Sequence, residues 1–292
     1  MKKTKITQAA VSGFLVAVML AGCGIRTGYA PVRVTVHQGS AALLTAAPRD
    51  SLRVAAWNIQ YGLDVEGALK EIKADSNLAT ADVILLQEMG PVGIRTIAAA
   101  LGLNHVYGPA SVSPHHAKLF GNGVLSRWPI INTQILVLPH ETMLTGHRRI
   151  AVAADIALPQ GRNLRAISVH TATMVMDQDK RIEQAAAIMD SLGAFAGPIV
   201  LGGDFNTVSD YEVTLLRRTM RRLGLDAVRL PPGPTIRNKY KKMPGSVPVL
   251  DHLFSLGLDA GSRGIADQAV SSDHLPIWAV FAFPTGPDEN EP

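Results

Sequence analysis

Apolar runs that end abruptly in carboxylate, amide or imidazole side chains constrain this chain more than any other feature. The clearest run, PIVLGGDFNTVSD, changes from aliphatic residues to Asp204 and Asn206. Residues two apart on an extended backbone point to the same side, so both side chains can converge on one reacting group. A carboxylate can orient water or bind a metal, and an amide can hold the water or a phosphate. The pair indicates hydrolysis, although an Asx turn explains it equally well when taken alone.

Further apolar runs carry polar residues in the same way. Several of them end in a polar side chain, and one contains Asp251 within an apolar stretch, where a charge without a partner would be costly. So many coincidences in one chain are hard to explain as turns. The polar residues concerned are Asn58, Glu88, His170, Asp251, Asp273 and His274.

Between these residues, runs typical of strands alternate with runs typical of helices. We expect helices over residues 65–74, 92–101, 177–192 and 211–223. We expect strands over residues 52–57, 83–86, 123–125, 131–138, 150–158, 164–169, 199–201, 249–256 and 275–283. Wholly apolar strands indicate sheets that are covered on both faces, so the pattern predicts the α/β class. With 292 residues and 47% hydrophobic content, the chain is expected to hold one large domain.

The first residues are typical of an exported protein. Three lysines precede an apolar stretch over residues 9–21, which is short for a membrane span but suits a signal peptide. The stretch ends in Leu-Ala-Gly-Cys, which resembles a bacterial lipoprotein lipobox. Cys23 is the sole cysteine and cannot form an internal disulfide, so lipid attachment is favoured over ordinary cleavage nearby. We expect a signal peptide at 1–22, a tether at 23–50, a domain at 51–284 and a polar tail at 285–292.

Overall charge gives little support for nucleic-acid binding. The net charge is +4, but the expected leader holds three lysines and no acid, so the remaining chain is close to neutral. Two local patches could follow a phosphate backbone or anionic lipids. We interpret the arginines as a solvated helix face. For the loop, both phosphate binding and a plain surface loop remain alternatives, because the loop lies just before Asp251. The patches are Arg217, Arg218, Arg221 and Arg222, and a loop with Arg237, Lys239, Tyr240, Lys241 and Lys242.

Taken in order, these motifs resemble the endonuclease/exonuclease/phosphatase family of metal-dependent phosphoesterases. The resemblance covers roughly residues 51–284, and GDFN followed by SDHLPI is its specific part. It implies a four-layer α/β sandwich, with two packed, mostly antiparallel sheets flanked by helices and the site at one end of the sheets. The motifs are WN at 57–58, QE at 87–88, GNGVLSRWPI at 121–130, SVHT around His170, GDFN at 203–206, LDH at 250–252 and SDHLPI at 272–277.

The resemblance also implies residue roles. Glu88 would be the principal ligand of Mg²⁺, with Mn²⁺ or Ca²⁺ as alternatives, since hard cations prefer carboxylate oxygen. Asn58 and Asp273 would assist on the metal side. Asp204 would orient or deprotonate the attacking water, and Asn206 would support the water or the phosphate.

Histidines complete the implied site. His274, aimed by Asp251, would hydrogen-bond the phosphate or act as a base. His170 would contact the phosphate and help to protonate the leaving oxygen, but no acid partner for it is evident. Arg149 is either a phosphate contact or part of a surface salt bridge. We read His252 as support or packing, Arg181 and Gln184 as structural, and His115 and His116 as loop residues without a special role.

The implied function is hydrolysis of phosphodiesters by a membrane-anchored, metal-dependent enzyme. DNA is the first substrate that we expect, and a sphingomyelinase-like or other small-phosphodiester activity is the alternative. A noncatalytic binding lipoprotein is a third possibility. Gly24, the residue after Cys23, is not an acidic signal of the kind that retains lipoproteins in the inner membrane. In a Gram-negative cell, the lipoprotein is therefore expected in the outer membrane. We expect a monomer.

Overall fold

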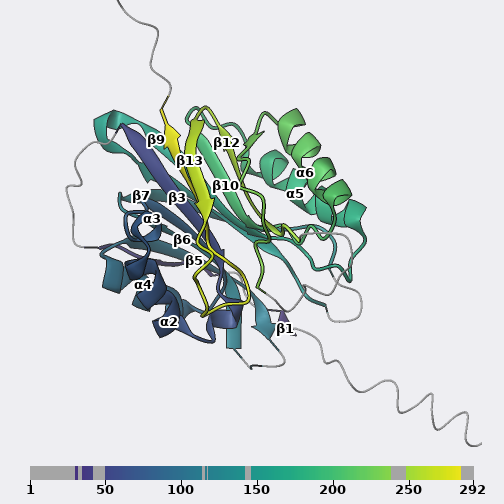
Figure 1. Cartoon of the computed structure of the whole chain (residues 1–292), viewed down its shortest axis with the longest axis horizontal. Helices are drawn as coiled ribbons and strands as arrows, with labels where there is room; N and C mark the ends of the chain where they lie inside the picture. Colours follow the sequence, from purple (N-terminus) through teal and green to yellow (C-terminus); the bar gives the residue numbers. More distant parts are fainter. Residues whose placement is uncertain are drawn as a thin grey trace, which may run out of the picture.

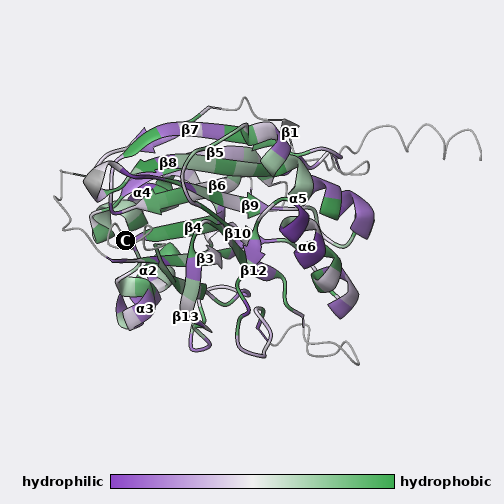
Figure 2. Ribbon diagram, turned by 90° about the horizontal axis from the view of Figure 1, so that it is seen from above, coloured by the Kyte–Doolittle hydropathy of each residue, from purple (hydrophilic) through white to green (hydrophobic). Residues whose placement is uncertain are grey.

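Two packed sheets with helices on their outer faces give the protein four layers (Figure 1, Figure 2). The computed structural model describes residues 30–31, 35–41, 50–113, 116, 118–141, 146–237 and 248–283. The expected signal peptide, Cys23, the tail from 285 and the basic loop residues Lys239, Tyr240, Lys241 and Lys242 lie outside these residues. The predicted four-layer α/β sandwich is confirmed.

The first sheet is built from the first six strands of the chain and its last two. Strands β3 and β4 are parallel, and their neighbours are antiparallel. β2 (His37–Gly39) pairs with β5 beside the main path. The order is β1 (Ala30–Pro31), β5 (Asn104–Ser113), β6 (Lys118–Ser126), β4 (Val83–Met89), β3 (Ser51–Asn58), β14 (Ile277–Ala282) and β13 (Asp259–Ile265).

The second sheet is built from the middle of the chain. Strands β9 and β10 are parallel, and the other pairs are antiparallel. Both sheets are therefore mostly antiparallel, as predicted. The order is β11 (Asp226–Ala227), β12 (Asp251–Leu256), β10 (Ile199–Asp204), β9 (Asn163–His170), β8 (Ile150–Ala157) and β7 (Ile130–Val137).

Helices cover the outer faces of both sheets. α2 (Val65–Ala74), α3 (Ser76–Ala79) and α4 (Pro91–Leu101) lie on the first sheet, and α5 (Gln178–Leu192) and α6 (Asp210–Arg222) lie on the second (Figure 2). Two short 3₁₀ turns are η1 (Gln60–Gly62) and η2 (Pro159–Gly161). Side chains cap the starts of α2 and α6: the Asp64 carboxylate accepts a hydrogen bond from the Gly67 N–H, and the Ser209 hydroxyl accepts one from the Glu212 N–H. Among the described helices, none is long and apolar enough to cross a membrane.

Three apolar clusters hold the layers together. One lies between the sheets and includes Leu85, Val152 and Phe281. The second packs α2 and α4 against the first sheet, and the third packs α5 and α6 against the other. Because the inner strands are covered on both faces, their sequences are continuously apolar rather than alternating.

Polar side chains join the two sheets beneath the strand ends. Gln87 on β4 donates from Nε2 to the Ser168 hydroxyl over 2.9 Å, and that hydroxyl donates to the Leu86 carbonyl over 2.9 Å. Asn122 on β6 donates to the Ile150 carbonyl over 2.9 Å. Buried groups of this kind must be hydrogen-bonded, so these contacts fix how β4 of one sheet lies against β9 of the other.

Some strands differ from the sequence expectation. Strand β5 was missed because it contains Gly108 and Pro109, which are typical of turns, and β13 because its exposed edge residues lack an apolar pattern. Part of the expected tether, residues 23–50, forms β1 and β2. Without β1 and β2, strand β5 would be the edge of its sheet, and its open backbone groups are the ones with which these segments pair.

Gly121 provides a test of the sheet packing. A Cβ atom there would collide with the Gly108 carbonyl oxygen and crowd the Ala110 backbone nitrogen, and neither can yield without moving β5. We predict that Gly121→Ala lowers the free energy of unfolding by about 2 kcal/mol or more, measured by urea denaturation. Gly261→Ala is the matched control, because its Cβ would meet only the Val280 carbonyl at 3.4 Å. Equal stability of both variants would contradict the packing described.

Candidate active site

A cavity of about 390 Å³ lies where strand ends of both sheets meet. β3 and β4 of the first sheet and β9 and β10 of the second end there, and β12 begins there because it runs antiparallel to β10. The topology thus brings together residues far apart in sequence. Its polar lining includes Glu88, His170, Asp204, Asn206, Asp273 and His274.

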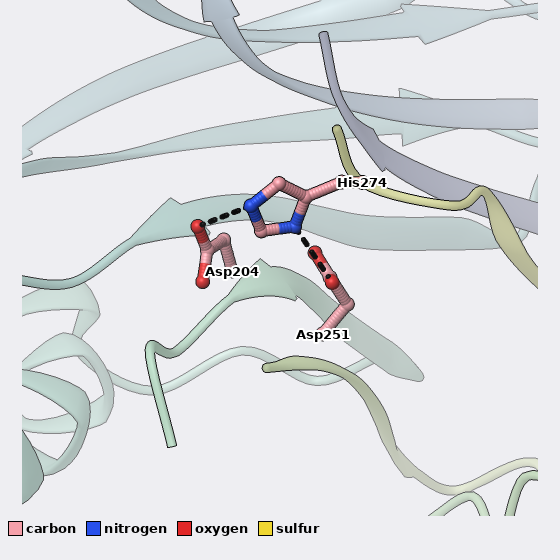
Figure 3. Close-up of side chains that lie close together, drawn as sticks. All are labelled: Asp204, Asp251 and His274. Atoms are coloured by element: carbon pink, nitrogen blue, oxygen red, sulfur yellow. Dashed lines mark hydrogen bonds and ion pairs between the residues drawn. The ribbon is translucent and has the colours of Figure 1, made fainter. Parts of the chain in front are cut away.

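Asp204, Asp251 and His274 form the centre of this site (Figure 3). His274 Nδ1 lies 2.9 Å from Asp251 Oδ2, and its Nε2 lies 3.6 Å from Asp204 Oδ2. Asp204 and Asp251 are opposite each other in the β10–β12 register, which explains why both carboxylates reach one ring. The His274 carbonyl accepts a hydrogen bond from the Trp57 indole over 2.9 Å, which fixes the segment before β14.

Electrostatics favour a charged His274. Burial alone would lower the pKa of this imidazole, but the carboxylates of Asp251 and Asp204 outweigh it and raise the pKa to about 10. Burial raises the pKa of Asp204 to about 7, although the His274 charge opposes the shift. At neutral pH the ring is therefore an imidazolium that donates to Asp251 and faces Asp204 and the cavity.

Two amide residues hold Asp204 in place. The Asn58 side-chain amide donates to Asp204 Oδ2 over 2.9 Å, and the Asn206 backbone N–H donates to Oδ1 over 2.9 Å. The Asn206 side chain donates to the Thr171 carbonyl over 3.1 Å. Asp204 is 1% exposed, so these bonds fix its carboxylate against the cavity.

Glu88 lines the cavity near the end of β4. The Tyr61 backbone N–H donates to Glu88 Oε2 over 3.1 Å, and burial raises the pKa of this carboxyl group, while the charges of Arg149 and His274 oppose the shift. Asn58 Oδ1 accepts from the Gln60 N–H over 3.1 Å. Asn58 and Asp273 both act on the Glu88 carboxyl group, so the three predicted ligands lie close together, and Glu88 and Asp273 line the cavity.

Unusual backbone conformations gather around this cavity. Among the described residues other than glycine, those with positive φ are Gln60, Tyr61, Glu88, His140 and Asn206, and all but His140 line the cavity. A left-handed backbone is strained for side chains with a Cβ atom and persists only where the surroundings enforce it. Such strain is concentrated at functional sites, and the sequence carries no signal of it.

Arg149 is buried beside His170, so the predicted alternative of a surface salt bridge is wrong. Its Nη1 atom lies 2.9 Å from each His170 ring nitrogen, one of which can accept a hydrogen bond in the neutral ring. Burial lowers the pKa of His170 well below its usual value, and the Arg149 charge adds to this effect. The ring also lies 3.3 Å from Asp204 Oδ2 and 3.8 Å from Glu88 Oε1.

Arg149 was named from the sequence, but its contact with His170 was not predicted, because that contact depends on strand register. Ile150 pairs with His170 across β8 and β9, so the residue before Ile150 arrives at the ring. The position of Arg149 immediately before an apolar strand was the one sequence signal that it could reach the site at the strand ends.

Other candidate residues support the fold around the site. His252 lies 2.8 Å from the Thr207 hydroxyl and packs against Phe205 and Phe254, as predicted. Arg181 pairs with Glu212 over 2.5 Å and joins α5 to α6. Gln184, Arg217, Arg218, Arg221, Arg222 and His116 lie outside the cavity lining, and His115 lies outside the described residues.

The donor groups fit a hard divalent cation in two ways. Ligand atoms of Asp204, Asp251 and His274 lie within 4.8 Å of one another and could bind a metal. However, a metal there would compete with the hydrogen bond between His274 and Asp251. Glu88 is the other candidate, because its side chain is 14% exposed and its desolvated carboxylate would be stabilised by a cation.

The chain belongs to the Endonuclease/Exonuclease/phosphatase family, whose model matches residues 55–287. The family name joins nucleases and phosphatases, which are hydrolases of phosphoesters.

Curated relatives carry no assigned activity in their names. A UPF0294 protein of Vibrio parahaemolyticus is 30% identical over 133 residues, which cover 46% of this chain and 45% of the relative. One from Klebsiella pneumoniae is 28% identical over 253 residues, which cover 82% of this chain and 84% of the relative. The first match therefore spans less than half the length of that relative.

Solved structures share the fold. A family member from Beutenbergia cavernae superposes with a TM-score of 0.69 at 22% identity, covering 82% of this chain and 73% of that chain. TDP2 of D. rerio, solved with a single-strand DNA product, gives a TM-score of 0.62 at 18% identity, covering 80% and 99%. The human Nocturnin catalytic domain gives 0.62 at 18% identity, covering 86% and 98%.

The pKa shifts predict how stability depends on pH in EDTA. The pKa values of His274 and Asp204 are raised above those of the unfolded chain, so their contributions are present at low pH and are lost as pH rises through about 10 and about 7. We therefore expect the thermal midpoint to fall by at least about 3 °C between pH 6.5 and 10. Asp251→Asn should flatten this decline. A midpoint that rises over this range in the unmodified protein would contradict the charge assignment.

Proposed function

We propose that the protein is a divalent-metal-dependent phosphodiesterase and that DNA is its first substrate. The observation that carries the proposal is the convergence on one cavity of a buried imidazole bonded to a carboxylate, a buried carboxylate held by two hydrogen bonds, and a second, partly exposed carboxylate. His274, Asp204 and Glu88 are these three groups. Neither binding alone nor fold stability requires this combination, because burying the charges costs free energy.

On the side of the attacking water, Asp204 orients the water and accepts its proton. Its pKa of about 7 suits that role, since a general base works best when its pKa is near the working pH. Asn206 supports the water or the phosphate. His274, aimed by Asp251, donates a hydrogen bond from Nε2 to a phosphate oxygen and stabilises its charge.

On the opposite side, Glu88 would hold the metal ion, with Asn58 and Asp273 as further oxygen ligands. All three offer the hard donors that Mg²⁺ prefers, and Mn²⁺ or Ca²⁺ suits the same set. When bound, the ion supplies positive charge that stabilises the phosphoester during hydrolysis.

His170 acts in this account as a phosphate contact. A neutral ring beside Arg149 can hydrogen-bond a phosphate oxygen, but it has no additional proton to give to the leaving oxygen. In the proposed mechanism, His170 therefore does not protonate the leaving oxygen, although the sequence predicted that role.

The surroundings of the cavity support DNA as the substrate class. Ile236 and Pro248 line the cavity, and they flank the chain segment that carries the basic loop residues Lys239, Lys241 and Lys242. Positive charge there would attract a phosphate backbone. The similarity to TDP2, which was solved with a DNA product, adds support at the level of the fold.

A lipid phosphodiester is the second candidate. Apolar side chains line one wall of the cavity, and Met174 and Val175 are 49% and 69% exposed. Exposed apolar residues beside a phosphoester site would suit a sphingomyelin-like substrate.

We also propose that lipid on Cys23 anchors the protein as a monomer in the outer membrane of a Gram-negative cell. The lipobox-like sequence supports the anchor, and Gly24 supports the outer membrane. A noncatalytic binding lipoprotein is the alternative that the next experiment tests.

We predict that the purified protein nicks plasmid DNA with Mg²⁺ and not with EDTA. Asp204→Asn should lower the rate at least about a hundredfold, because it removes the proton acceptor but preserves the shape of the side chain. Arg218→Ala on the outer face of α6 is the matched control and should cut normally. Cleavage of sphingomyelin alone would favour the second candidate, whereas full activity of Asp204→Asn would refute the mechanism.

A further inference from the structure

We propose that a second cavity, on the far side of Tyr61 from the candidate active site, binds the nucleotide next to the scissile phosphate, with its base stacked on the Tyr61 ring. This inference rests on the proposed function and narrows its substrate to nucleic-acid strands. It gives Tyr61 the role of a specificity residue.

Tyr61 is a shared wall of two cavities. It lines the candidate active site together with Glu88, and it lines a cavity of about 620 Å³ at the start of α4. A substrate that extends from the reacting phosphate past Tyr61 therefore enters the second cavity. A mononucleotide or a small phosphate ester would leave that cavity empty.

Local structure holds Tyr61 firmly in this place. Its backbone is left-handed, with φ of 56°, and its N–H donates to the Glu88 carboxylate. Its ring lies 4.9 Å from His116 and meets the edge of Phe120 at 5.3 Å, measured between ring centroids. A strained backbone bound to the proposed metal ligand thus fixes an aromatic ring beside the reaction site, as expected of a functional position.

The walls of the second cavity suit a nucleotide. Gly90 and Gly93 line this cavity without contributing side chains, so the wall by α4 is formed there by backbone. Lys118 offers positive charge for a phosphate, and Glu66 offers an acceptor for base amino groups. Val65 and Leu119 supply apolar surface.

Stacking on the half-buried Tyr61 ring requires a base that is not already stacked in a duplex. Single-stranded segments meet this requirement, and stacking on an aromatic side chain contributes about 1–3 kcal/mol per base. The geometry therefore points to single-stranded or locally opened DNA as the preferred substrate.

The test is binding of a fluorescein-labelled thymidylate strand of about ten nucleotides, measured by anisotropy in EDTA so that hydrolysis does not consume it. We expect Tyr61→Ala to weaken binding at least about fivefold and Tyr61→Phe to preserve it, because only the first removes the ring. Leu63→Ala is the matched control: Leu63 is 49% exposed two residues away but lines neither cavity, so its loss should not change binding. Thermal unfolding establishes that each variant is folded.

Three results would overturn the inference: no binding of the strand, equal binding by Tyr61→Ala, or Tyr61-dependent binding of sphingomyelin vesicles in place of DNA. Hydrolysis of bis(p-nitrophenyl) phosphate by the unmodified protein tests the proposed function separately, because this ester needs only the first cavity. Hydrolysis without Tyr61-dependent strand binding would leave the function standing and remove the inference. Tyr61-dependent binding without hydrolysis would remove the proposed function, and with it the scissile phosphate of the inference, and would leave Tyr61 only as a strand-binding residue.

Discussion

The hydrogen bond between His274 and Asp251 is the contact on which the site depends. It is buried at the start of β12. Without Asp251, Asp204 would be the main charge left to offset the cost of burying a charged His274 ring. The β10–β12 register puts Asp204 opposite Asp251, so the same pairing that builds the sheet also assembles the charges. The Trp57 indole reaches the His274 backbone from β3 and ties this arrangement to the other sheet. The contacts that assemble the fold therefore also assemble the site.

The site holds its two histidines in different charge states, although both rings lie close to Asp204. His274 is held as an imidazolium between carboxylates, whereas His170 is held neutral beside the Arg149 guanidinium. Two histidines of the same intrinsic chemistry thus take different protonation states because of their neighbours. Glu88 lies near Arg149 and His170, and its buried carboxylate is the natural place for a cation in the proposed mechanism.

Much of this could be predicted from the sequence, for an identifiable reason. Where an apolar run ends in Glu88, His170 or Asp204, the sequence itself indicates both a strand and a candidate site residue at its end. The motifs GDFN and SDHLPI indicated the family, so the sandwich fold was expected. The pairing of Arg149 with His170 was not predictable, because it depends on the register of β8 against β9. The left-handed backbone of Tyr61, whose N–H donates to Glu88, was not predicted either, because such a conformation leaves no trace in composition. Strand β5 was missed because Gly108 and Pro109 look like turn residues until their neighbours in the sheet are known.

In the proposed mechanism the metal ion and the His274–Asp251 pair occupy separate parts of one cavity. Anomalous scattering from a crystal soaked in Mn²⁺ would locate the ion, because the ion appears at its own ligands whatever the substrate is. We expect a single strong peak beside the Glu88 carboxylate, with the hydrogen bond between His274 and Asp251 intact. A peak between Asp204, Asp251 and His274, with that hydrogen bond broken, would contradict this mechanism.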